Sequence, residues 1–267
     1  MESEPGPKVR DFLARLPEGG RYFFLSRDVS EMLGLSRTAV KQALNRLRHK
    51  GEIASPARGV YVIVPPEYRA LGCLPADQFI PALMAHSETP YYAGLLSAAQ
   101  YHGAAHHRPQ EFQVMLSKPR RPISCGKVRV VFHVRKHIAA VPVQHFNTLR
   151  GTVAVSSPEA TAFDLVGYEA KIGGLDAVAT ILLDLADQLD PAKLAALAPT
   201  VPLPWLQRLG YLLEHIDEAP RAKALKEYVR AHARDATVLQ PPVHKENPYP
   251  RSQDWKLILN ANVEAET

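Results

Sequence analysis

The sequence predicts an α+β protein with a winged helix-turn-helix domain at the N-terminus, followed by a mixed α/β domain that ends in a helical, bundle-like region. Residues 26–62 have the pattern of a helix, a short turn, a second helix and a hairpin. Residues 111–155 alternate as strands do, and a helical pattern follows up to residue 234. The double proline Pro65-Pro66 ends the wing, so we expect domains over residues 1–66 and 67–267.

The helix-turn-helix is expected between Ser26 and Gly51. Ser26 is placed to cap a first helix, which ends at Gly34 because glycine adopts the left-handed conformation readily. Ser36 then caps a second helix over residues 37–50, and the short connection at residues 34–36 has the length of a helix-turn-helix corner. Upstream, residues 9–16 are expected to form a helix and residues 22–24 a short strand.

The second helix has one apolar and one polar face. Its apolar stripe consists of Val40, Ala43, Leu44 and Leu47. The residues expected to contact DNA here are Ser36, Arg37, Thr38, Lys41, Gln42, Asn45, Arg46, Arg48 and His49. The amides of Gln42 and Asn45 can pair with an adenine edge in the major groove, and the cations suit the flanking phosphates. A solvated helix face is the alternative, but the preceding helix and the following wing favour DNA.

The wing is expected over residues 52–64, where a β-rich run follows a turn made by Pro56 and Gly59. Arg58 lies at the tip and could reach a phosphate or the minor groove. The alternative is an ordinary charge at a hairpin tip.

The second domain is expected to contain both strands and helices. Strands are predicted at residues 111–116, 127–134, 144–149, 153–155 and 255–260, and an extended tail at 241–251. Helices are predicted at residues 77–86, 91–101, 157–169, 174–189, 191–197, 204–215 and 219–234. Lys118, Arg120 and Arg121 form a basic loop between strands, for which a secondary phosphate contact and a solvated loop are equally acceptable interpretations.

Composition agrees with a cytoplasmic protein that binds nucleic acid. The net charge of +5 over 267 residues is modestly favourable for such binding. Cys73 and Cys125 are far apart in sequence and lack metal or redox spacing, so we expect ordinary reduced cysteines. No signal peptide or membrane-spanning run is evident.

Together these features resemble the AbiEi antitoxin family of type IV toxin–antitoxin systems. The resemblance is carried by the N-terminal winged helix, by residues 91–99 (YYAGLLSAA) and by residues 155–165 (VSSPEATAFDL). It implies a phage-defence antitoxin whose winged helix binds double-stranded DNA at inverted repeats in its own promoter and represses the operon. It also implies a nucleotidyltransferase-like toxin, which the second domain neutralises without a stable complex.

Enzymatic interpretations are weak, and we expect no catalytic residue, cofactor or metal. His102 and His106 are spaced for one helical face and His107 is adjacent, but Gly103 interrupts that helix. The stretch from Asp164 to Lys171 has nuclease-like residues, but it reads as helix and its spacing is too short. A nuclease and a stand-alone winged-helix regulator with a ligand-sensing or assembly domain remain the alternatives.

The Ser157–Asp164 element also has two interpretations. Ser157 and Pro158 start a helix well, and Glu159 favours its positive end. We therefore favour a structural role over direct contact with a toxin or nucleic acid.

Overall fold

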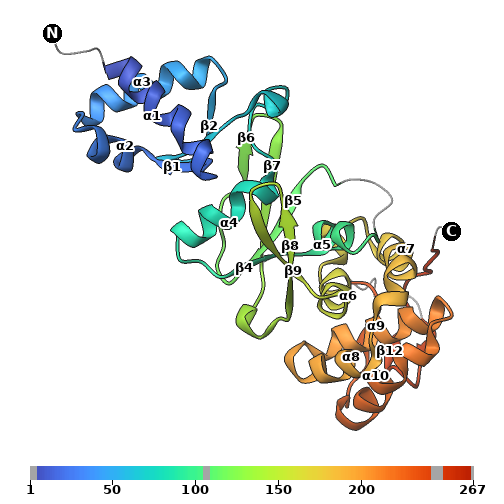
Figure 1. Cartoon of the computed structure of the whole chain (residues 1–267). Helices are drawn as coiled ribbons and strands as arrows, with labels where there is room; N and C mark the ends of the chain where they lie inside the picture. The colour runs from blue at the N-terminus through green and yellow to red at the C-terminus, as the bar shows by residue number, and fades with distance from the viewer. Residues whose placement is uncertain (1–4, 105–108, 242–248, 266–267) are drawn as a thin grey trace. The chain divides into compact units, whose positions relative to one another are not determined.

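The computed structural model describes residues 5–104, 109–241 and 249–265, and within them the chain has the predicted α+β architecture (Figure 1). It divides into two compact units. The first contains residues 1–92, 110–136 and 145–154, and the second contains residues 93–109, 137–144 and 155–267. The winged helix thus shares its unit with part of the larger sheet, and the proposed boundary after residue 66 stays a prediction.

The N-terminal part of the first unit is a winged helix. Its elements are α1 (Pro5–Arg15), β1 (Phe23–Leu25), α2 (Ser26–Leu33), α3 (Arg37–His49), β2 (Ile53–Ala57) and β3 (Val60–Ile63). The strands form an antiparallel sheet of order β1-β3-β2. Val9 and Leu13 of α1, Val29 of α2 and Leu44 of α3 pack in one core under this sheet. Burial of these apolar side chains fixes α3 with its polar face outward.

The remainder of the first unit packs against the wing. It contains the 3-10 turn η2 (Pro66–Tyr68), α4 (Ala76–His86), β5 (Phe112–Leu116), β6 (Ile123–Cys125) and β7 (Val128–Val134). β7 pairs in parallel with β5 and antiparallel with β6. Val60 and Val62 of the wing share a core with Phe79 of α4 and Val130 of β7. Side chains of α4 and β7 therefore pack against those of the wing.

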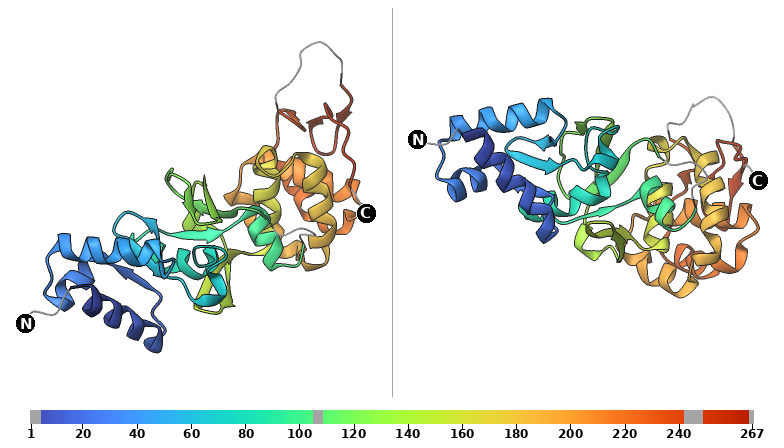
Figure 2. Two further views of the ribbon diagram at one scale, coloured as in Figure 1. Left: turned by 90° about the horizontal axis from the view of Figure 1, so that it is seen from above. Right: turned by 45° about the horizontal axis from the view of Figure 1, so that its top comes forward.

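Helices dominate the second unit, as expected for its bundle-like end. They are α5 (Leu95–Tyr101), α6 (Pro158–Gly167), α7 (Leu175–Leu185), α8 (Pro191–Leu197), α9 (Leu203–His215) and α10 (Ala219–His232). Figure 2 shows those from α6 to α10, coloured yellow to orange, lying beside one another from two sides.

The larger sheet has the order β6-β7-β5-β4-β9-β8. Besides β5, β6 and β7 it contains β4 (Tyr91–Ala93), β8 (Val143–Thr148) and β9 (Gly151–Ser156).

The C-terminal segment belongs to the core of the second unit. The predicted strand at residues 255–260 shrinks to β12 (Leu257–Ile258), which lies between β10 (Thr237–Val238) and β11 (Arg251–Ser252). Trp255 is fully buried against Gly210 of α9, where any side chain would collide with the indole. Of the predicted extended tail at 241–251, residues 242–248 lie outside the described part.

Two local predictions are wrong. Residues 91–93 form strand β4 instead of the start of a helix, because Ala93 pairs with Val155 of β9 and this tertiary pairing outweighs the local helical pattern. The helix begins only at Leu95, whose φ is +53°. Ser26 does not cap α2 but is its first residue; Leu25 holds the cap position and makes no side-chain cap.

The two cysteines, distant in sequence, meet in the core of the first unit. Gly72 and Gly126, which flank them, approach so closely that a Cβ on Gly72 would lie 3.2 Å from the Gly126 Cα atom. The Cys125 thiol and burial both raise the pKa of Cys73 well above its ordinary value. Both thiols are free and buried in the structure.

Candidate nucleic-acid interface

The helix-turn-helix corner is built by short polar contacts. Gly34 ends α2 with a φ of +61°, as predicted for a left-handed helix end. The Ser30 hydroxyl donates to the Leu35 carbonyl at 2.6 Å across the turn. Ser36 caps α3 as predicted, since its Oγ atom accepts a hydrogen bond from the Ala39 amide at 3.2 Å. The angle between the helices is thus fixed locally, before any contact with a partner.

The predicted division of α3 into two faces is present in the structure. The buried face consists of Val40, Ala43, Leu44 and Leu47. The exposed residues are Ser36, Arg37, Thr38, Lys41, Gln42, Arg46, Arg48 and His49, while Asn45 is half-buried. Within the described residues, no salt bridge is formed by Arg37, Lys41, Arg46 or Arg48. The charges of these four side chains are therefore available to an anionic partner.

The wing tip is held by hydrogen bonds that the sequence did not reveal. Ser55 Oγ donates to the carbonyls of Ala57 and Val60, both at 3.0 Å, across an irregularity in the β2–β3 pairing. The Ser26 amide donates to the Gly59 carbonyl at 3.0 Å, which joins the start of α2 to the tip. Gly59 has a φ of +76°, and Arg58 beside it is exposed. These hydrogen bonds therefore fix the backbone on which Arg58 is carried.

The basic loop at residues 118–121 is less uniform than the sequence suggested. Lys118 and Arg121 are exposed, but Arg120 lies with its guanidinium carbon 5.4 Å from the centre of the Phe132 ring. Its burial there lowers the pKa of Arg120. Arg120 thus packs on the protein, and only Lys118 and Arg121 extend into solvent.

Of the histidines considered for metal binding, His102 has a structural partner. His102 is buried and its Nε2 atom donates to the Ser156 carbonyl at 2.8 Å; burial lowers the pKa of His102. His106 and His107 lie outside the described residues. Among the residues described, no group of three histidine, cysteine or acidic side chains is arranged to hold a metal ion.

The Ser157 element behaves as a helix start. Ser157 Oγ accepts a hydrogen bond from the Ala160 amide at 3.3 Å and donates to Glu159 at 2.8 Å. Glu159 in turn accepts from the Asp190 amide at 3.2 Å, at the start of α8. These contacts support the structural role that we favoured for the element. Phe163 of the same element is fully buried.

A basic, amide-bearing helix set in a helix-turn-helix with a wing defines the class of winged-helix domains, in which such a helix commonly enters the major groove. The family comparisons agree with this class. Residues 11–64 match the family described as "Transcriptional regulator, AbiEi antitoxin", and residues 92–215 match the "AbiEi antitoxin C-terminal domain". Together the matches cover more than half of the chain, which belongs to the AbiEi antitoxin family, a regulatory family.

Comparison with solved structures supports the fold. The crystal structure of the RV2827C protein from Mycobacterium tuberculosis superposes with a TM-score of 0.68 and 19% identity, over 94% of this chain and 91% of that one. The solution structure of the antibiotic-resistance factor ANT(2'')-Ia matches 57% of this chain and 94% of its own, at 14% identity and a TM-score of 0.32, too low to indicate a shared fold. No curated protein sequence matches the chain.

Over the described part of the chain, no helix combines the length and apolar character needed to cross a bilayer.

Proposed function

We propose that this protein is a DNA-binding antitoxin that represses its own operon. The observation that carries the proposal is the exposed face of α3, where amides lie beside cations that form no ion pair with any described residue. The helix follows a capped corner and is joined to a hydrogen-bonded wing. In this arrangement Gln42 and the half-buried Asn45 read base edges, and Arg37, Lys41, Arg46 and Arg48 contact phosphates. Ser36, Thr38, His49 and Arg58 complete the interface, and Lys118 and Arg121 offer a secondary contact.

The toxin side of the proposal rests on the family. We propose a type IV system for phage defence in the cytoplasm, in which the counteracted toxin is a nucleotidyltransferase-like enzyme and no stable complex forms. The second unit carries the neutralising activity. Membership of the AbiEi antitoxin family supports an antitoxin role in general terms.

The DNA part is tested by a gel shift on the region upstream of the gene, at fixed salt. The double variant Gln42→Ala/Asn45→Ala should lose about 1–3 kcal/mol per lost base contact on the operator and little on random DNA. Gln144→Ala, an exposed amide of β8, is the matched control and should bind as the parent does. Equal operator binding by the double variant and the parent would show that α3 does not read bases.

The antitoxin part is tested by growth rescue. Cells that express a nucleotidyltransferase encoded beside the gene should recover when this protein is supplied, and the two proteins should not co-purify. Failure to rescue, with operator binding intact, would instead favour a stand-alone winged-helix regulator.

A further inference from the structure

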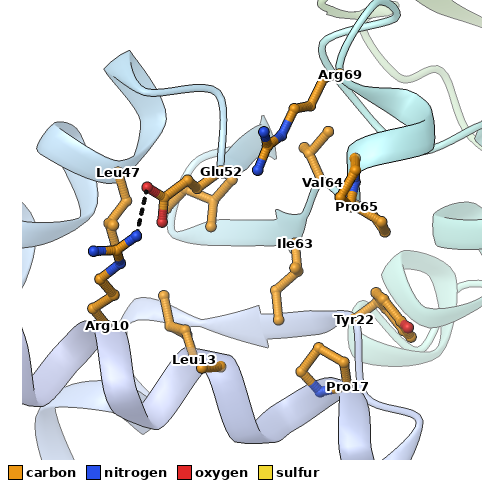
Figure 3. Close-up of a pocket in the computed structure, with 13 residues that line it drawn as sticks. Arg10, Leu13, Pro17, Tyr22, Leu47, Glu52, Ile63, Val64, Pro65 and Arg69 are labelled. Atoms are coloured by element: carbon orange, nitrogen blue, oxygen red, sulfur yellow. Dashed lines mark ion pairs between the residues drawn. The ribbon is translucent and has the colours of Figure 1, made fainter.

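A pocket of about 520 Å³ lies in the winged-helix part of the first unit (Figure 3). Its walls come from α1, from the end of α3, from β3 and from the segment that follows β3. Leu13, Leu47, Ile63 and Val64 make the pocket largely apolar. Its volume is within the range of roughly 300–1,000 Å³ that small-molecule sites occupy.

Charged side chains stand at the rim of this pocket. Arg10 of α1 and Glu52 form an ion pair at 3.5 Å, which engages the carboxylate. Arg69 reaches toward the pocket from the opposite wall, as Figure 3 shows. Among the residues that the structure describes, Arg69 has no ion-pair partner, so the rim carries one guanidinium whose charge is not balanced.

We propose that this pocket binds a small amphipathic anion, namely an apolar and preferably aromatic body that bears one carboxylate. The apolar walls, with the ring of Tyr22 and the rings of Pro17 and Pro65, would take the body. Arg69 would take the carboxylate, since a planar guanidinium matches a carboxylate in a bidentate hydrogen-bonded pair. The Arg10–Glu52 pair limits the site to a single net positive charge, which fits a monoanion.

The position of the pocket links its occupant to the recognition helix. Leu47 belongs to α3, and the Glu52 amide donates to the Leu47 carbonyl at 3.1 Å. Glu52 is also joined to Val64, whose amide donates to the Glu52 carbonyl at 2.9 Å. A ligand that contacts these residues touches the end of α3 and the base of the wing together. Its binding therefore changes the affinity for DNA, a consequence that rests on the proposed function.

The binding site itself is tested with 2-naphthoate as the probe and uncharged 2-naphthamide as its counterpart, by calorimetry on the full chain. The acid should bind at one saturable site, about tenfold more tightly than the amide, because the amide lacks the charge-assisted contact. Arg69→Ala should abolish this preference and leave amide binding unchanged. Arg21→Ala, an exposed arginine outside the pocket, should bind both probes as the parent does.

A second variant tests the pocket without removing charge. Ala14 lines the pocket from α1 and is exposed, so Ala14→Phe should fill the space without disturbing the core. The binding of both probes should then weaken by about tenfold or more. The proposal is overturned by absence of saturable naphthoate binding below about 1 mM, which is weaker than ordinary ligand affinities. It is also overturned if the parent and the Arg69→Ala variant bind the acid with equal affinity. A third contrary outcome is an Ala14→Phe variant whose oligomeric mass changes while its affinity for both probes does not.

The link to DNA is measured separately, by a gel shift with and without saturating 2-naphthoate. A shift of operator affinity in the parent that disappears in Arg69→Ala supports the link. Naphthoate binding without operator binding would overturn the proposed function while leaving the ligand site standing. Operator binding that naphthoate does not alter would overturn only the link.

Discussion

The guanidinium carbon of Arg150 lies 4.1 Å from the centre of the Tyr22 ring. Arg150 sits in the turn between β8 and β9, whereas Tyr22 directly precedes β1 of the winged helix. The same guanidinium hydrogen-bonds Gln78 of α4, pairs with Glu67 at 3.2 Å and approaches the Tyr68 ring at 5.3 Å. One buried arginine thus joins the winged helix to the rest of the first unit through a cation–π contact and charged hydrogen bonds.

Removal of this arginine should destabilise the first unit. Arg150→Ala loses the stacking and both charged hydrogen bonds, so we expect a loss of about 2–4 kcal/mol in the free energy of unfolding. Arg150→Lys should recover only part of it, because an ammonium cannot replace the planar fork. Urea unfolding provides the measurement, with the exposed Arg121→Ala as control. A stability of Arg150→Ala equal to that of the control would contradict a joining role.

Lys41 should contribute to DNA affinity without regard to sequence. If it contacts one phosphate, Lys41→Ala reduces the slope of log K against log salt by about 0.9 and weakens operator and random DNA alike. Titrations at several salt concentrations measure the slope. Lys171→Ala, an exposed lysine of the second unit, should leave it unchanged. A selective loss on the operator would instead assign Lys41 to a base.

Gly210 should be irreplaceable because Trp255 packs on it. In the middle of α9 an alanine normally improves helix stability, yet here its Cβ would collide with the buried indole. We expect Gly210→Ala to displace Trp255 and to cost about 1–3 kcal/mol, as overpacking does.

Tryptophan fluorescence reports this displacement. In a Trp205→Phe background only Trp255 emits, since the chain has two tryptophans. Its emission should shift to the red in Gly210→Ala. An unshifted spectrum with increased stability would show that the C-terminal segment does not pack on α9 in this way.

His102 should make stability depend on pH. Burial holds the pKa of His102 below its ordinary value of 6.5, although the Ser156 carbonyl and Glu159 oppose the effect. The unfolded chain then binds more protons than the folded one as the pH falls below 6.5, so this contribution is complete above that pH and declines below it. His102→Gln should flatten the pH dependence of unfolding between neutral pH and pH 5.

The exposed His49→Gln variant is the control for that measurement and should keep the slope of the parent. An unchanged slope in His102→Gln would mean that His102 does not titrate below its ordinary range.

Much of the winged helix follows from local sequence alone. The corner around Gly34, the Ser36 cap and the two faces of α3 depend on neighbouring residues and on helical periodicity, which a sequence displays directly. The part of the chain after the winged helix is harder to predict from sequence, because the contacts that decide its structure are distant in sequence. The strand at 91–93 exists only because Ala93 pairs with Val155.

The α+β class, the winged helix and the side chains on the exposed face of α3 could be predicted because each depends on the order of nearby side chains. The stacking of Arg150 on Tyr22, the packing of Arg120 on Phe132 and the position of Arg69 at an apolar pocket could not be predicted in this way. These relationships join segments separated by many residues. They form because burial and close packing select one arrangement of the whole chain, which no local pattern contains.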